Sequence, residues 1–143
     1  MSKWNKEKFL SDLEENCSRE VVKVTKEIIK FSERYSEHIS WGRGSEHGTM
    51  TFRCTSDVGL LPLFHLNSEG NINLQINFLR NKDIPKMVLR DMVVKLESNF
   101  LIEYDPEMYP VDSFEPIENL FHTKSQVTKF LKTIEGCVYR LKQ

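Results

Sequence analysis

The stretch TMTFRCTSDVGLLPLFHLN, residues 49–67, decides the fold of this chain. Met50, Phe52 and Cys54 alternate with polar residues, which is the side-chain period of a half-buried β-strand. The letters TSDVG then supply turn-forming residues, and the apolar run Leu60–Leu66 predicts a second strand. Because the connection is short, we expect Thr49–Thr55 and Leu60–Leu66 to be antiparallel neighbours.

Two further strands are expected on either side of this pair. His38–Trp41 precedes it with the same alternation, and Ile72–Phe78 follows it after the turn letters NSEGN. In Ile72–Phe78 every second residue is apolar, and the residues between them are Asn73, Gln75 and Asn77. The four strands together predict an antiparallel meander.

Helical spacing replaces the strand period at both ends of the chain. Two helices are expected before the sheet, Lys6–Glu15 and a second that begins after Ser18. In the second, apolar residues recur every three or four positions, at Val21, Val24, Ile28, Phe31 and Tyr35. This single apolar stripe is typical of a helix that covers the sheet of its own domain; a coiled-coil partner is the alternative.

Two more helices are expected after the sheet. The first has Asp83 as its N-cap and Pro85 in its first turn, and continues for about three turns. Residues 100–121 contain three prolines, so we expect extended chain there with a short helical turn at 117–121. The last helix begins at Thr123, which has capping-box spacing to Gln126, and its apolar stripe runs to Leu141.

These elements predict an α+β fold for a single domain, residues 1–143. Two N-terminal and two C-terminal helices pack mainly on one face of the four-stranded antiparallel meander, because that arrangement buries every apolar stripe.

Composition excludes several classes of protein. The chain carries a net charge of −1 and 39% hydrophobic residues, and has no apolar run of membrane-spanning length. Its first residues lack the features of a signal peptide, so a cytoplasmic protein without a membrane partner is expected. Cys17, Cys54 and Cys137 lack zinc-binding spacing, and we expect no metal site and no cofactor. An acidic stretch, 97–119, lies between two basic ones, 79–96 and 120–143, which favours an acidic segment folded across basic helices.

The letters SWGRGSEHGTM, residues 40–50, place Gly42, Gly44 and Gly48 between two strands. A strand rather than a helix follows these glycines, which argues against a dinucleotide fingerprint, and no Lys-Ser or Lys-Thr pair follows for a P-loop. A hairpin loop whose glycines adopt positive φ is the favoured interpretation. The alternative is an anion-binding nest beside Arg43 and His47.

The polar side chains of the strands are expected to share the sheet face opposite the helices. They are His38, Ser40, Thr49, Thr51, Arg53, Asn73, Gln75 and Asn77. Such a face is usually solvated, but its amides and Arg53 could bind a ligand. If Leu60, Phe64 and Leu66 point inward, Leu61 and Leu63 lie on this outer face. Their apolar surface would then favour a second protein chain there.

Two functional hypotheses follow, and neither assigns a catalytic residue. We favour a non-enzymatic binding module that uses the polar face and the loop 42–48. Its candidate ligand-binding residues are Arg43, His47, Arg53, Asn73, Gln75 and Asn77, and its partner is a protein, a second copy of the chain, or nucleic acid. The alternative is a small enzyme or ligand-binding protein. Its cleft would lie between the glycine loop, the acidic segment 103–118 and the C-terminal helix, with Arg43, His47, Arg53 and His65 as polar groups.

Overall fold

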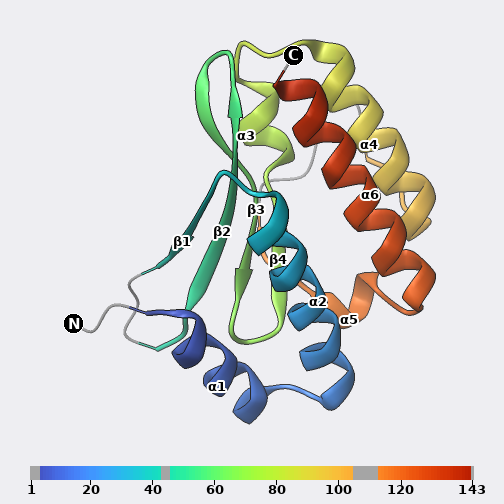
Figure 1. The fold of residues 1–143 in the computed structure, drawn as a ribbon. Helices are drawn as coiled ribbons and strands as arrows, with labels where there is room; N and C mark the ends of the chain where they lie inside the picture. The colour runs from blue at the N-terminus through green and yellow to red at the C-terminus, as the bar shows by residue number, and fades with distance from the viewer. Residues whose placement is uncertain (1–3, 43–45, 105–112, 143) are drawn as a thin grey trace.

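The computed structural model describes residues 4–42, 46–104 and 113–142. Its sheet contains β1 (His38–Trp41), β2 (Thr49–Ser56), β3 (Gly59–Asn67) and β4 (Asn71–Leu74), each antiparallel to the next (Figure 1). A two-residue strand, β5 (Glu115–Pro116), extends the β4 edge and was not expected. The predicted antiparallel meander is therefore confirmed, with one short strand added.

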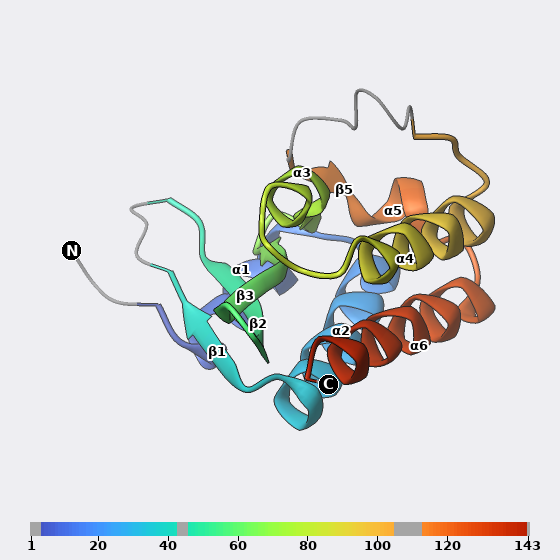
Figure 2. The ribbon, with the colours of Figure 1, turned by 90° about the horizontal axis from the view of Figure 1, so that it is seen from above.

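Helices pack on one face of this sheet, as predicted. The elements before it are α1 (Lys6–Asn16) and α2 (Arg19–Tyr35), and those after it are α3 (Ile76–Arg80), α4 (Lys86–Phe100), α5 (Ile117–Leu120) and α6 (Lys124–Leu141). Figure 2 shows α2 and α6 beside the sheet and α4 next to α6. The fold is α+β, and none of the described helices is both long and apolar enough to span a membrane.

A run of aromatic rings joins the two layers. Phe31 of α2 stacks on Phe52 of β2 at 6.1 Å between centroids, and Phe52 stacks on Phe64 of β3 at 5.1 Å. Phe130 of α6 contacts Phe64 edge-on at 5.7 Å. Burial of such rings is a dominant favourable contribution to folding.

A β-bulge explains why β3 is apolar in both phases. Phe52 pairs with Phe64, but the next residue of β2, Arg53, pairs with Pro62, so that Leu63 is the extra residue. Beyond the bulge Leu61 shares the inner face with Cys54, and Leu63 is also buried, whereas Leu60 is exposed. The expectation that Leu61 and Leu63 would form an outer apolar patch was wrong.

The fourth strand was predicted too long. β4 ends at Leu74, and residues 76–80 form α3 instead of continuing the strand to Phe78. Continuing the register of β3 and β4 would set Ile76 opposite Pro62, which has no N–H to donate to the ladder. The chain therefore leaves the sheet. Ile76 and Leu79 are both buried, one turn apart on the helix α3.

The predicted cap of α4 was also wrong. Pro85 rather than Asp83 stands at the N-cap, where it makes no side-chain hydrogen bond. The predicted capping box of Thr123 and Gln126 is confirmed, and α2 begins after Ser18 as expected, with the Ser18 side chain accepting from the Val21 N–H.

Candidate functional site

Close packing, rather than an unusual backbone conformation, explains why a glycine stands at position 48 of the loop. A Cβ at Gly48 would lie 2.6 Å from Cε3 of Trp4, so the indole ring occupies the space of a side chain. The positive φ angles of the described glycines belong to Gly59 and Gly70. The expectation that Gly42 and Gly48 supply positive φ was therefore wrong, while Arg43 and Gly44 lie outside the described residues.

His47 contacts the first helix rather than an open loop surface. Its Nδ1 lies 3.0 Å from Oδ2 of Asp12 in α1, and its Nε2 lies 3.5 Å from a carboxylate oxygen of Glu69. Ser68 donates its hydroxyl to the same Asp12 oxygen at 2.5 Å and accepts the Gly48 N–H at 2.8 Å. Asp12, His47, Ser68 and Glu69, here called the Asp12 cluster, tie α1 to the β1–β2 loop and the β3–β4 turn.

The hydrogen bonds of the Asp12 cluster shift two pKa values in opposite directions. The hydrogen bond to Asp12 raises the pKa of His47 against the opposing effect of its partial burial, and Glu69 adds to the rise. Partial burial by itself would raise the pKa of Asp12, but the bonds from Ser68 and His47 outweigh it and lower that pKa. The charged pair is therefore stabilised in the folded chain.

Although it contains serine, histidine and aspartate, the Asp12 cluster is not arranged for nucleophilic catalysis. A catalytic serine gives its proton to the histidine, but the Ser68 hydroxyl donates to Asp12. Ser68 is also completely buried, so no substrate can reach its oxygen. The cluster is a structural tether between α1 and the sheet.

Four polar side chains lie side by side across the outer face of the sheet. Ser40, Thr51, His65 and Asn73 are register partners on successive strands, and we call them the polar row. The Thr51 hydroxyl and His65 Nδ1 are 2.7 Å apart, and Arg53 donates to Ser40. The row is thus largely hydrogen-bonded within the chain.

The polar row is not an open, solvated surface along its whole length. Thr51 and Asn73 are each 7% exposed. Gln75, at the N-cap of α3, is 8% exposed, and its side-chain amide donates to the side-chain oxygen Oδ1 of Asn73 at 2.8 Å. Asn77 stands in α3 and not on a strand. No observation tests ligand binding by the predicted residues Arg53, Asn73, Gln75 and Asn77. A nucleic-acid partner likewise remains a prediction.

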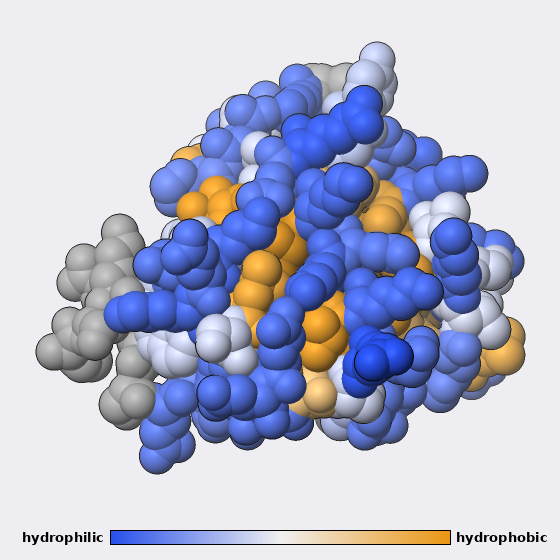
Figure 3. Space-filling view, turned by 60° about the horizontal axis from the view of Figure 1, so that its bottom comes forward, coloured by the Kyte–Doolittle hydropathy of each residue, from blue (hydrophilic) through white to orange (hydrophobic). Residues whose placement is uncertain are grey.

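The hollow between α2, α5 and the start of α6 offers more open space. It has a volume of about 330 Å³, within the range of small-ligand pockets. Its floor is apolar and comes from all three elements, with Val21 and Val24 of α2, Ile117 of α5, Phe121 just after α5, and Val127 of α6. We call it the α2–α6 hollow; the view of this side in Figure 3 shows apolar surface in patches between hydrophilic side chains.

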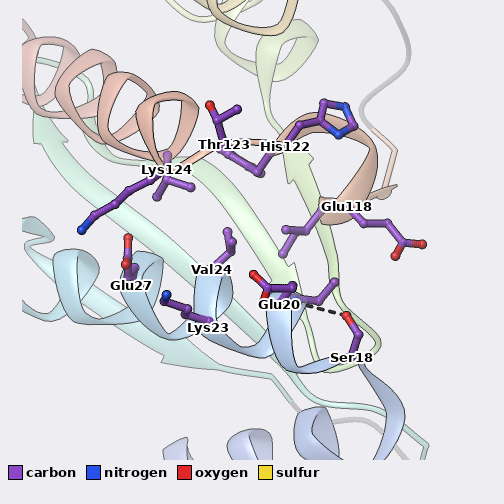
Figure 4. A pocket seen from close by; sticks show the side chains of 13 residues that line it. Ser18, Glu20, Lys23, Val24, Glu27, Glu118, His122, Thr123 and Lys124 are labelled. Carbon is purple, nitrogen blue, oxygen red and sulfur yellow. Dashed lines mark hydrogen bonds between the residues drawn. The ribbon is translucent and has the colours of Figure 1, made fainter.

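Charged side chains of both signs surround this floor. Glu20 and Glu118 lie toward the end marked by Ser18, whereas Glu27 and Lys124 lie toward the opposite end, with Lys23 beside Glu27 (Figure 4). In the described part of the chain, none of these five side chains takes part in an ion pair.

The alternative hypothesis expected a cleft at part of this position. The end of the acidic segment and the C-terminal helix do line the hollow, but its third wall is α2. The described residues of the glycine loop, 42 and 46–48, are not among the lining residues. Sequence reasoning assigned Val21 and Val24 to the core stripe of α2 and gave no role to the charged residues beside them.

The described residues give no sign of metal or thiol chemistry. Among them, no three His, Cys, Asp or Glu side chains gather as a metal-binding group. Burial raises the pKa of Cys54 and of Cys137 to about 12, so both thiols stay protonated and pack as small apolar side chains.

The structure is an α+β domain with a hollow between α2, α5 and the start of α6 on its helical layer. Compared with models of protein families, with curated protein sequences and with solved structures, the chain shows no match.

Proposed function

We propose that this chain is a non-enzymatic binding module that accepts an amphipathic helix of a partner protein in the α2–α6 hollow. One observation carries the proposal: a hollow whose apolar lining is buried except at the half-buried Val24, surrounded by charged side chains without ion-pair partners in the described residues. Apolar surface of this kind gains free energy when a partner covers it.

The shape of the site favours a helix as the occupant. Two helices, α2 and α6, and the short α5 form its walls, and a partner helix can lay its apolar face into such a groove. Val24 is only half-buried in the free chain, so a partner side chain can still cover it. Apolar residues spaced by three and four positions on the partner would contact this floor.

The charges around the hollow favour one orientation of the partner. Glu20 and Glu118 complement a basic residue near the Ser18 end, and Lys124 complements an acidic residue near the other end (Figure 4). Such rim charges contribute mainly to the rate and specificity of association, while the apolar floor contributes most of the affinity.

A displayed library of helical peptides, selected against the full chain, tests the proposal. We expect enriched peptides to be amphipathic, and Val24→Glu to weaken their binding at least about tenfold because a carboxylate in the floor is desolvated without a partner. Val58→Glu is the control for the added charge, since Val58 is exposed and lies in the β2–β3 turn, outside the hollow.

Two results would contradict this function. One is a selection that enriches no helical peptide. The other is a set of peptides that bind the wild-type chain and Val24→Glu equally well, because their site must then lie elsewhere. Thermal unfolding of both valine variants checks that each remains folded.

A further inference from the structure

A second groove, between α4 and α6, has a different chemistry from the α2–α6 hollow. It has a volume of about 320 Å³ and is lined by Lys95, Ser98 and Asn99 of α4 and by Lys129, Lys132 and Thr133 of α6. Its charged lining residues are all lysines. We call it the basic groove; α4 and α6 lie side by side along it (Figure 2).

The lysines of the basic groove are only partly neutralised within the described chain. Lys95 forms an ion pair with Asp91 at 3.0 Å, one turn earlier on α4. Lys129 and Lys132, one turn apart on α6, form no ion pair with any described residue. Their mutual repulsion would be relieved by a bound anion.

The wall behind the lysines is fixed in place. The side-chain amide of Asn99 donates to the Gln126 carbonyl at 2.9 Å, and Gln126 donates back to the Asn99 carbonyl at 3.1 Å. This reciprocal pair holds the end of α4 against the start of α6. The groove is therefore organised before any ligand binds, which lowers the entropic cost of binding.

Asn99 supplies a second, independent observation. The residue is 8% exposed, and its side-chain oxygen Oδ1 is buried without a hydrogen-bond partner. A buried acceptor without a donor is costly, and a hydroxyl group of the ligand beside its phosphate can donate to this oxygen. Ser98 adds a hydroxyl group to the lining, whereas the Thr133 hydroxyl already donates to the Lys129 carbonyl at 2.8 Å.

We infer that the basic groove binds a compact, multivalent phosphate group of a small molecule. Lysine ammonium groups bind phosphate as point charges, and lysines from two helices can surround one such group. The volume of the groove suits a small ligand better than an extended polymer. This site is separate from the proposed peptide site, since the two share no lining residue.

Calorimetric titration of the full chain with tripolyphosphate tests this inference. We expect binding that weakens as salt is added, and that falls at least about tenfold in the double variant Lys129→Ala/Lys132→Ala, since two charge-assisted contacts are lost. The double variant Lys8→Ala/Lys30→Ala removes the same charge from exposed positions outside the groove and should bind like the wild type. Amide NMR shifts on binding should concentrate at residues 98–99 and 129–133.

Three results would overturn the inference. They are no tripolyphosphate binding at low salt, equal weakening in both double variants, and binding of an oligothymidylate without binding of tripolyphosphate. The second would indicate diffuse attraction by surface charge, and the third an extended polyanion surface. The peptide selection and the tripolyphosphate titration test different residues, so failure of the proposed function would leave this result unaffected.

Discussion

At the α1 end of the sheet the charged side chains contact one another, whereas around the α2–α6 hollow the described charged side chains form no ion pair. The Asp12 carboxylate receives hydrogen bonds from Ser68 and from His47, and the Trp4 ring covers Gly48. Around the hollow, by contrast, charged side chains surround apolar floor without ion pairs among the described residues.

The difference between the two regions separates stability from binding. A charged group that is already paired in the folded chain stabilises it but has little left to offer a partner. An unpaired charge beside exposed apolar surface contributes little to stability and remains free for recognition. Substitutions in the Asp12 region should therefore change the free energy of unfolding, and substitutions around the hollow should change binding.

The largest effect on stability is expected at Gly48. In Gly48→Ala the new Cβ would lie 2.6 Å from Cε3 and 2.9 Å from Cδ2 of the Trp4 ring, so ring and backbone must move apart. We expect a loss of about 1–3 kcal/mol in the free energy of unfolding, the usual cost of overpacking. Urea denaturation measures it.

Gly136→Ala is the control for Gly48→Ala, because it should change the free energy of unfolding in the opposite direction. Gly136 lies inside α6, and a Cβ there would meet nothing within 4 Å. Alanine should stabilise the helix by about 0.5–1 kcal/mol, because glycine loses more backbone entropy. Equal effects at the two glycines would contradict the close contact between Gly48 and Trp4.

The next largest effect is expected for Asp12→Asn. The amide keeps the shape of the carboxylate but has no negative charge. The carboxylate oxygen that lies 3.0 Å from His47 and accepts from the Ser68 hydroxyl is therefore replaced by a neutral group. We expect the free energy of unfolding to fall by about 1–2 kcal/mol, in the range of hydrogen bonds to charged groups. Asp57→Asn, in the exposed β2–β3 turn, should change it by less than about 0.5 kcal/mol. Similar losses in both variants would show that Asp12 tethers nothing.

The architecture could be predicted from the sequence alone because the spacing of apolar residues, which indicates strands and helices, is a local property. The alternation in residues 49–55 and the helical stripe from Val21 to Tyr35 each depend on neighbours within a few positions. The errors arose where distant residues decide the outcome. β4 stops because Pro62 of another strand cannot pair with it, and β3 changes phase at a bulge that only its partner strand reveals.

The sites were harder to predict for the same reason. His47 was singled out as a ligand-binding residue, but its partner Asp12 is distant in the sequence and belongs to α1. The two walls of the α2–α6 hollow are likewise far apart in the chain, at residues 18–27 and 117–127. Charged residues on α2 resemble an ordinary solvated helix face until the fold places α5 opposite them.

A smaller effect follows from the pH dependence of the Asp12–His47 pair. The pKa of His47 is raised from 6.5, so its contribution is complete below pH 6.5 and is lost as pH rises through the raised value. The pKa of Asp12 is lowered from 3.8, so its contribution is complete above pH 3.8 and is lost as pH falls through the lowered value.

The stabilisation by this pair should therefore be greatest between pH 3.8 and 6.5. Urea denaturation of the wild type and Asp12→Asn across this range and above it measures the difference. We expect the gap between the two proteins to narrow as pH rises past the raised pKa of His47, by about 1 kcal/mol or less because the pair is partly exposed. A gap that widens above pH 6.5 would contradict the ion pair.

The smallest effect is expected for Lys124→Gln at the edge of the α2–α6 hollow. Lys124 is the first residue of α6, where the partial positive charge of the helix N-terminus disfavours a cation. Removing the charge should raise the free energy of unfolding by about 0.3–0.5 kcal/mol while weakening binding of acidic helical peptides. Lys142→Gln, at the other end of α6, removes a favourable cation that is paired with Glu37 and should lower stability by a similar amount. If Lys124→Gln instead lowers stability and leaves peptide binding unchanged, Lys124 serves the fold, and the contrast between a closed and an open region does not hold there.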